Sequence, residues 1–413
     1  MFLEKEGKLI YSYDGETVCI EAWGKDALRV RATKNRSFTG RDWALEAKDA
    51  HAGEVEIFED PSAKGGAFAN MYEGTDTSYG KITNGKLHAV INSGSVITFY
   101  HEDGRVLLKE HFRRLRDEES MPLNIMGREY SNGVGDNFRI VARFVARKGE
   151  KIFGMGQYQQ HELDLKGCML ELAQRNSQVS VPFYLSSIGY GFLWNNPGVG
   201  QVMFANNGTE WVTESGKEID YLVIAGDTPA EIEENYMTLT GKPPMMPEYG
   251  MGFWQCKLRY WNQEQLLSVA RKYKELGVPL DVIVVDFFHW TKQGEFKFDP
   301  KYWPNVPGMC RELKEMGIQV VVSVWPTVDI YSENFEEMKE KGYLVRTEHG
   351  VPLTMLCGGN EVFFDATNPD ARTYVWEKIK KNYYDQGAKL FWLDVAEPEY
   401  SVYDFKNYRY QLG

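Results

Sequence analysis

The sequence predicts a two-domain protein of mixed class, in which an antiparallel β-sandwich is followed by a domain of alternating β-strands and α-helices. Short stretches that alternate between apolar and polar residues recur over residues 1 to about 225, and turns rich in Gly, Asn, Asp and Ser separate them. From residue 249 onward, helices that end at glycine lead directly into apolar strands. Three prolines within residues 243–247 separate the two patterns, so we expect domains at 1–240 and 241–413.

The first domain is expected to consist mainly of strands. The clearest alternating stretches are residues 87–100, 137–146, 180–187 and 190–196. The sequence also predicts a helix over 228–241, because Thr228 can cap it and Pro229 suits the first helical position. Glu231 stands where the partner residue of a capping box is found.

The second domain repeats a strand–helix unit. Strands are expected at 250–258, 280–288, 319–326 and 389–395. Helices are expected at 262–276, 307–316, 334–341 and 369–386, each followed directly by a glycine. A doubly wound sheet has the same order of elements. A (β/α)8 barrel of the TIM type is favoured because the active sites of such barrels lie where the strands end. The chemically distinctive residues near these strand ends are Trp254, Asp286, Trp325 and Asp394.

The β/α pattern is shorter than a whole barrel. Four strands are recognised, whereas a closed barrel has eight. The chain stops at Gly413, soon after the fourth strand. We therefore expect the sequence to be the N-terminal part of a longer protein, with about the first four β/α units of the barrel.

Composition excludes several classes of function. The net charge of -12 repels phosphate backbones, which argues against nucleic-acid binding, and no run of about 18 apolar residues could cross a membrane. The first ten residues lack the apolar core of a secretory signal, and the cysteines are odd in number and scattered, so a reduced, cytoplasmic protein is expected. These cysteines, predicted to be mostly buried, are Cys19, Cys168, Cys256, Cys310 and Cys357.

Two carboxylates stand at predicted strand ends. Asp394 follows an apolar strand and is soon followed by Glu397 and Glu399; such crowding of acids at a barrel mouth favours glycoside chemistry. The alternative is an aspartate that caps the next element of the chain. Asp286 precedes two phenylalanines, and a carboxylate beside aromatic rings is typical of a sugar subsite, although a capping role is again the alternative. His289 is interpreted as a structural hydrogen-bonding residue, and no metal or cofactor is expected.

Several segments resemble glycoside hydrolase family 31, which contains retaining α-glucosidases and α-xylosidases. They include KIFGMGQYQQHELDLKG, GFWQCKLRY, VPLDVIVVDFFHW and, most specifically, FWLDVAEPE, which is similar to the family's W-x-D-M-N-E nucleophile motif. The resemblance implies Asp394 as the nucleophile, with Glu397 as a supporting carboxylate. It also implies that Asp286 binds sugar hydroxyls and that Trp325 and Trp392 line the pocket. Val395 and Ala396 depart from the Met-Asn of the motif. The general acid/base is expected beyond Gly413.

Within the family, the residues after Asp286 favour an α-xylosidase over an α-glucosidase. Xylose lacks the C6 hydroxymethyl group of glucose, and the bulky Phe287 and Phe288 would fill the space that this group needs. The expected partner is therefore a carbohydrate, an α-xyloside before an α-glucoside. Three points stay open: a catalytically incomplete sugar-binding fragment, hydrolysis against transglycosylation, and a homo-oligomer of the full-length protein.

Overall fold

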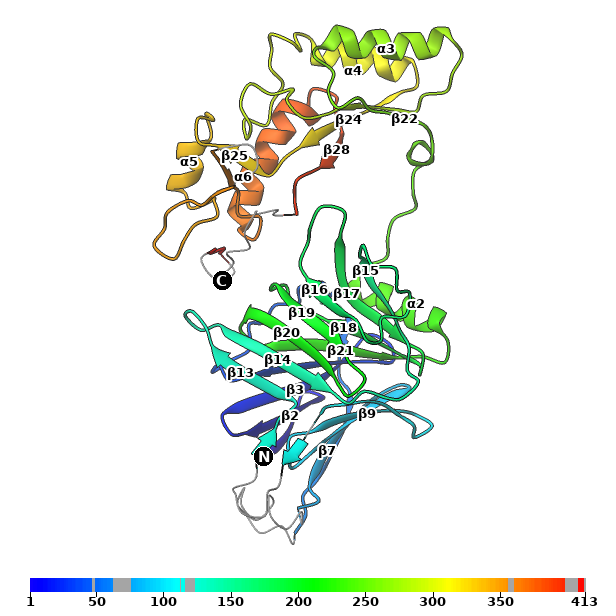
Figure 1. Cartoon of the computed structure of the whole chain (residues 1–413), viewed down its shortest axis with the longest axis vertical. Coiled ribbons are helices and arrows are strands. Elements are labelled where there is room, and N and C mark those ends of the chain that lie inside the picture. Colours follow the sequence, from blue (N-terminus) through cyan, green and yellow to red (C-terminus); the bar gives the residue numbers. More distant parts are fainter. Residues whose placement is uncertain are drawn as a thin grey trace. The chain divides into compact units, whose positions relative to one another are not determined.

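A computed structural model describes residues 1–46, 49–61, 76–111, 113–115, 123–355, 360–397 and 408–411. The chain divides into two compact units (Figure 1). The first comprises Met1–Ala173 and Ser177–Pro243, and the second comprises Pro244–Gly413 and Gln174–Asn176. Among the described residues, no helix combines the length and the apolar character needed to cross a bilayer.

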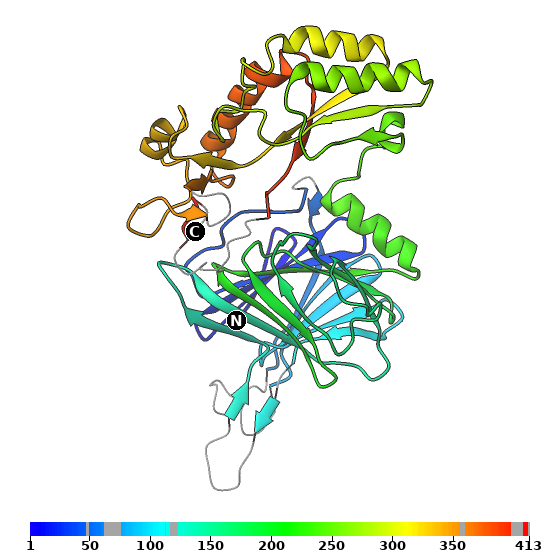
Figure 2. The ribbon, with the colours of Figure 1, turned by 45° about the horizontal axis from the view of Figure 1, so that its top comes forward.

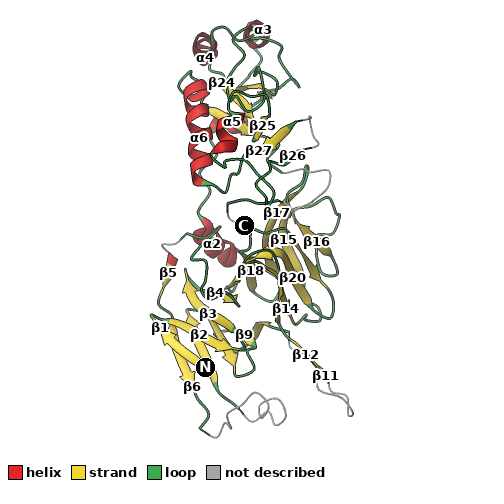
Figure 3. Ribbon diagram, turned by 90° about the vertical axis from the view of Figure 1, so that its left-hand side faces the viewer, coloured by secondary structure: helices red, strands yellow, loops and turns green. Residues whose placement is uncertain are grey.

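The first unit is built from antiparallel sheets, which dominate it in Figure 3. The largest has the order β1 (Phe2–Lys5), β2 (Lys8–Tyr13), β3 (Glu16–Trp23), β4 (Ala27–Thr33), β21 (Ile219–Ala225), β18 (Tyr190–Trp194), β17 (Val179–Ser186), β15 (Ile152–Gln157), with β5 (Ala50–His51) beside β3. A second has the order β10 (Val106–Lys109), β9 (Ile97–His101), β8 (Leu87–Asn92), β7 (Tyr79–Asn84), β6 (Glu54–Phe58). A third has the order β13 (Arg128–Asn132), β14 (Phe138–Phe144), β20 (Thr209–Gly216), β19 (Gly200–Phe204), β16 (Met169–Leu172). A short hairpin joins β11 (Arg113–Leu115) to β12 (Leu123–Ile125).

The largest sheet packs against the other two through one apolar core. Phe192 on β18 stacks on Trp211 of β20, with ring centroids 5.1 Å apart, and Tyr221 on β21 meets Phe99 of β9 edge to face. The opposite face of β18 and β21 is covered by α2 (Pro229–Thr240) through Ile232 and Leu239. The predicted antiparallel sandwich is therefore confirmed, and its layers are visible in Figure 2.

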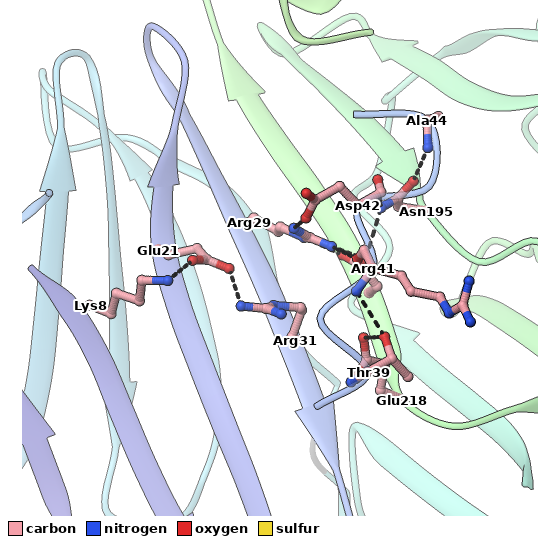
Figure 4. A network of polar contacts seen from close by, with 11 residues as sticks. Lys8, Glu21, Arg29, Arg31, Thr39, Arg41, Asp42, Ala44, Asn195 and Glu218 are labelled. Carbon is pink, nitrogen blue, oxygen red and sulfur yellow. Dashed lines mark hydrogen bonds and ion pairs between the residues drawn. The ribbon is translucent and has the colours of Figure 1, made fainter. Parts of the chain in front are cut away.

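A buried polar network ties a loop to the largest sheet (Figure 4). The Arg29 guanidinium on β4 donates to both carboxylate oxygens of Asp220 on β21, at 3.0 and 2.7 Å, and to Asp42 in the loop at 2.8 Å. Asn195 donates to Asp220 at 2.8 Å and accepts from the Ala44 amide of the same loop. Arg29 and Asp220 are both completely buried, so the pair depends on its mutual hydrogen bonds for compensation.

The second unit contains a parallel sheet in the order β22 (Trp254–Gln255), β23 (Val282–Val285), β24 (Gln319–Val324), β28 (Leu390–Leu393). The helices are α3 (Gln263–Glu275), α4 (Val306–Glu315), α5 (Phe335–Glu340) and α6 (Pro369–Ile379). A 3₁₀ turn, Glu248–Met251, precedes β22, and a π-helical turn, Lys380–Tyr384, extends α6. A small antiparallel sheet joins β25 (Thr327–Asp329), β27 (Glu361–Phe363) and β26 (Thr354–Met355). Helices α3 and α4, green and yellow in Figure 2, lie side by side.

Most predicted elements of this unit are confirmed, with three differences. The strand expected at 250–258 is reduced to Trp254–Gln255, because a 3₁₀ turn occupies the residues just before it. The helix expected at 369–386 is α-helical only to Ile379 and then widens into a π turn. The segment between α5 and α6, for which no regular structure was predicted, supplies β26 and β27; their short, non-local pairing leaves little trace in local sequence.

Candidate active site

The alternation of side chains along the parallel strands decides which residues meet. Val284, Val321 and Leu390 are register neighbours on three adjacent strands and pack in one cluster. The residues between them in sequence, such as Ile283 and Val322, instead pack with the helices. Because successive side chains point to opposite faces, residues an even number of positions beyond the first set stay on its face.

Three of the predicted site residues follow directly after strands of this sheet, and so stand at one edge of it. Asp286 stands two residues after Val284, and Trp325 and Asp394 stand four residues after Val321 and Leu390. All three follow the C-terminal ends of parallel strands, which is where β/α folds bind their substrates.

The Asp286 carboxylate is held by two donors. Its Oδ1 accepts from the Phe287 backbone N–H at 2.8 Å, and its Oδ2 accepts from the Cys256 thiol at 3.5 Å. Burial, followed by the negative charge of Asp286, raises the pKa of Cys256 to about 11, so the thiol keeps its proton at neutral pH. The single proton of Cys256 has two acceptors within reach, Asp286 Oδ2 and, at 3.6 Å, the Lys257 carbonyl; donation to Oδ2 orients Asp286.

Cys256 is a site residue that the sequence reasoning missed. The prediction of mostly buried cysteines holds for Cys19 and Cys310, whereas Cys168 is half-buried and Cys256 is exposed; Cys357 lies outside the described residues. The alternation of side chains could have identified it. Trp254 pairs with Val282, and Cys256 stands two residues after Trp254, on the strand neighbouring the one that leads to Asp286.

Aromatic rings line the chain beside Asp286. The Phe287 ring stacks on Trp325, with centroids 5.3 Å apart and planes 19° from parallel, and it touches Phe288 at 4.5 Å. Phe288 is 54% exposed and has a φ of +60°, a left-handed conformation that bulky residues rarely adopt. The Phe288 ring thus stays at the surface, in contact with Phe287.

His289 is structural, as predicted. It is 2% exposed, and its Nδ1 and Nε2 lie 2.9 Å from the Asp286 carbonyl oxygen and from the Tyr383 hydroxyl. Since a carbonyl can only accept, Nδ1 carries the proton and Nε2 accepts from Tyr383. Burial lowers the pKa of His289 to about 4, which keeps the ring neutral and locks the backbone of Asp286 in place.

Acid is expected to destabilise the protein through His289. Its pKa is about 4 in the folded protein and has the ordinary value of 6.5 in the unfolded chain, so between these values the unfolded chain binds the extra proton. The neutral His289 ring therefore contributes fully to the free energy of unfolding above pH 6.5. This contribution is lost, by up to about 1.4 kcal/mol per pH unit, as the pH falls toward 4. Urea unfolding at pH 7, 6 and 5 should show a shallower pH slope for His289→Gln than for the parent. Exposed His51→Gln is the control, and equal slopes for parent and His289→Gln would contradict the expectation.

Asp394 follows β28 and is half-buried. Its backbone N–H donates to the Val324 carbonyl at 3.2 Å, which ties the residue to the end of β24. No group among the described residues donates a hydrogen bond to its carboxylate. Val395 follows with a φ of +57°, which is strained for a β-branched residue, and such strain is concentrated at functional sites.

Two predicted site residues do not join the group around Asp286. Trp392 stands two residues before Asp394, and it lines a cavity of about 500 Å³ together with Trp254 and Leu390. Among the described ring contacts, none joins Trp392 to Phe287 or Trp325. Glu397 is half-buried, with no hydrogen-bond partner in the described part of the chain, and Glu399 lies outside that part.

Two family models match the chain. Residues 243–411 match the model of the glycosyl hydrolases family 31 TIM-barrel domain, and residues 17–202 match the glycosyl hydrolase 31 N-terminal galactose mutarotase-like domain. The predicted barrel type is thus confirmed for the second unit.

Individual relatives belong to the same family. A protein of Pseudescherichia vulneris, named as an uncharacterized family 31 glucosidase, is 45% identical over all of this chain and 76% of its own length. Alpha-xylosidase A of Aspergillus niger is 31% identical over 92% of this chain and 52% of its own. The crystal structure of a GH31 alpha-xylosidase from a soil metagenome, complexed with xylose, superposes with a TM-score of 0.89 at 49% identity.

That superposition covers 100% of this chain and 60% of the crystallised one, so the chain spans little more than half the length of the solved xylosidase. The two family models cover both units, and the match to the Pseudescherichia vulneris protein extends over the whole chain. The chain therefore belongs to glycoside hydrolase family 31.

Proposed function

We propose that the protein is a retaining α-glycoside hydrolase that removes terminal α-linked xylose. The observation that carries the proposal is the placement of Asp286, Trp325 and Asp394 directly after the C-terminal ends of three adjacent parallel strands. A carboxylate with oriented oxygens, a free carboxylate and a ring wall are the groups needed to hold and attack a sugar.

In this mechanism Asp394 is the nucleophile. Its carboxylate oxygen forms a bond to the anomeric carbon while the glycosidic bond breaks, and an acid protonates the departing oxygen. Water then cleaves the sugar–Asp394 ester, with the same acid acting as a base. We propose that the acid comes from a later barrel strand and that its carboxyl group lies about 5–5.5 Å from Asp394. Glu397 is proposed as a supporting carboxylate.

Asp286 is proposed to accept hydrogen bonds from the hydroxyls of the cleaved sugar. The donors on Oδ1 and Oδ2 use one lone pair of each oxygen, so a lone pair of each remains for the ligand. Trp325 and Phe287 form the wall beside it, and Trp392 is proposed to close the pocket beneath Asp394.

The proposed preference for xylose rests on Phe287 and Phe288, which follow Asp286 in the chain and whose rings contact each other. Two of the relatives are named as xylosidases, and one solved relative binds xylose. The name of the Pseudescherichia vulneris relative instead favours α-glucosidase activity as the second candidate.

The test compares turnover of 4-nitrophenyl α-xyloside and α-glucoside by the full-length natural protein. A higher kcat/KM on the xyloside supports the proposal, and a higher value on the glucoside favours the second candidate. Mass spectrometry after reaction with a fluorinated xylosyl fluoride should find the sugar attached to Asp394. Attachment to another residue would contradict the assignment of the nucleophile.

Replacing Phe288 with Ala is expected to raise activity on the α-glucoside relative to the α-xyloside. Removing the ring opens the space for a C6 hydroxymethyl group, and discrimination by one such group is worth about 1–3 kcal/mol. The measurement is the ratio of kcat/KM values on the two aryl glycosides. Phe253→Ala removes a ring of similar exposure, which stacks on Tyr273, and serves as the matched control. An unchanged ratio in Phe288→Ala would remove the steric explanation.

We also propose that the enzyme works in the cytoplasm. The cysteines in the described part of the chain are all free, which suits a reducing compartment: Cys19, Cys168, Cys256 and Cys310. Fractionation of the source cells with an activity assay tests this, and activity confined to the medium would contradict it.

A further inference from the structure

A cation lies between two exposed aromatic rings beside the proposed sugar site. The Arg259 guanidinium lies over the Trp261 ring, 3.6 Å from its centroid, and 5.2 Å from the centroid of Phe288. Trp261 is 60% exposed and Phe288 is 54% exposed. Arg259 and Trp261 lie between β22 and α3, whereas Phe288 follows β23, so two separate segments of the second unit build the stack.

The guanidinium has no acceptor of its own in the part of the chain that the structure describes. Among the described residues, none accepts a hydrogen bond from Arg259 or forms an ion pair with it, although arginine offers five N–H donors in one plane. By contrast, Arg271 on α3 is paired with Glu264 and Glu312. The rings hold Arg259 in one orientation and cover its faces, which leaves its edge for an oxygen-rich ligand.

The stack is continuous with the proposed site. The ring centroids of Phe288 and Phe287 are 4.5 Å apart, and the Phe287 ring stacks on Trp325 with centroids 5.3 Å apart. The carboxylate of Asp286, which is proposed to hold the cleaved sugar, adjoins this ring row in sequence and accepts from the Phe287 amide. The Arg259–Trp261 pair therefore lies at the exposed end of a row of rings whose other end is Trp325, a proposed wall of the sugar pocket.

We propose that Arg259 and Trp261 recognise the sugar that carries the cleaved residue, the aglycone, as a neutral pyranose. The guanidinium edge donates to its ring hydroxyls, and the exposed indole of Trp261 packs on its C–H face. This inference rests on the proposed function, because it assigns the second half of the same disaccharide. It makes Arg259 a determinant of the leaving group, separate from Phe288, which is proposed to select the cleaved sugar.

The experiment separates the two halves of the substrate. We compare two substrates, an α-xylosyl-glucose disaccharide and α-xylosyl fluoride, which has no aglycone sugar. Kinetics are measured for the full-length parent and for the variants Arg259→Ala, Arg259→Lys and Trp261→Ala. The ratio of kcat/KM for the disaccharide to that for the fluoride should fall at least about tenfold in Arg259→Ala, the scale of one lost hydrogen bond to a charged group. Arg259→Lys should lose most of this ratio as well, because lysine lacks the planar fork.

Binding gives a second readout that does not need turnover. Calorimetric titration of each variant, made in an Asp394→Ala background, compares the disaccharide with free xylose. Loss of Arg259 should lower the affinity for the disaccharide by a factor about ten times larger than the factor by which it lowers the affinity for xylose. Lys301→Ala, which removes a surface cation lying 5.0 Å over the exposed Tyr302 ring, is the matched control and should leave both values unchanged. Thermal melting shows whether each variant is folded.

Three results overturn the inference. The first concerns a parent that binds both the disaccharide and xylose. If the ratio of these two affinities is the same in folded Arg259→Ala as in the parent, Arg259 does not hold the aglycone. If glucuronate binds more tightly than glucose and loses that advantage in Arg259→Ala, the site selects a carboxylate and not a neutral sugar. If the parent binds neither sugar, the proposed function itself fails, and this inference fails with it.

Discussion

Asp394→Ala in the full-length protein is expected to lower kcat on an aryl α-xyloside on the order of 10⁶-fold, the scale seen when the nucleophile of another hydrolase is removed. The alanine cannot form the sugar ester, so the double displacement cannot begin. Folding should be retained, because the bond from the residue-394 amide to the Val324 carbonyl does not involve the side chain. No described group depends on the carboxylate for a hydrogen bond.

Azide gives a signature that a merely structural role would not produce. In the alanine variant the small anion can occupy the space of the lost carboxylate and attack the same face of the sugar. We therefore expect azide to restore turnover and to yield the β-xylosyl azide, which is identified by NMR. Asp385→Ala, which removes an exposed carboxylate paired with Lys380, is the control. Near-normal activity of Asp394→Ala without azide would show that another residue is the nucleophile.

Asp220→Ala is expected to destabilise the first unit by about 3–5 kcal/mol, the cost of leaving one partner of a buried ion pair uncompensated. Arg29 is 0% exposed, and Asp220 accepts two of its N–H groups and one from Asn195. Removing that carboxylate strands a buried cation whose remaining acceptors are Asp42 and the Arg41 carbonyl. The loop that carries these two residues should loosen with it.

Urea unfolding measured by tryptophan fluorescence tests this, because Trp194 and Trp211 lie in the core of the same unit. Asp227→Ala removes an exposed carboxylate paired with Lys86, and it should cost much less than Asp220→Ala because water screens an exposed pair. A loss in Asp220→Ala as small as that of Asp227→Ala would mean that Arg29 finds a new partner or reaches water.

Local signals predicted the helices well. Asn262 caps α3 and a glycine follows its last turn, and Thr228 accepts from the Glu231 amide at the start of α2. The Glu231 side chain, expected to complete a capping box, instead accepts from the Asp227 amide, one residue earlier. These contacts span a few residues, so short segments of sequence carry enough information to specify them.

The site was predictable to the extent that it depends on strand ends and on family motifs. Asp286, Trp325 and Asp394 stand at the ends of apolar runs, and the ends of adjacent parallel strands meet at one edge of the sheet. Cys256 and Arg259 were missed, because the strand before them has only two residues and shows no alternation to read. Their roles depend on contacts with residues about thirty positions away.

Local periodicity and short motifs were enough to specify the order of the two domains, the capped helices, the apolar parallel strands and the acidic residues at the strand ends. Three features of the site emerged only from the folded chain. The Cys256 thiol orients Asp286, Trp392 lies apart from the Phe287–Trp325 stack, and Arg259 lies between Trp261 and Phe288. These features require segments from different strands to meet, and the packing of distant side chains has no signature in any single stretch of chain.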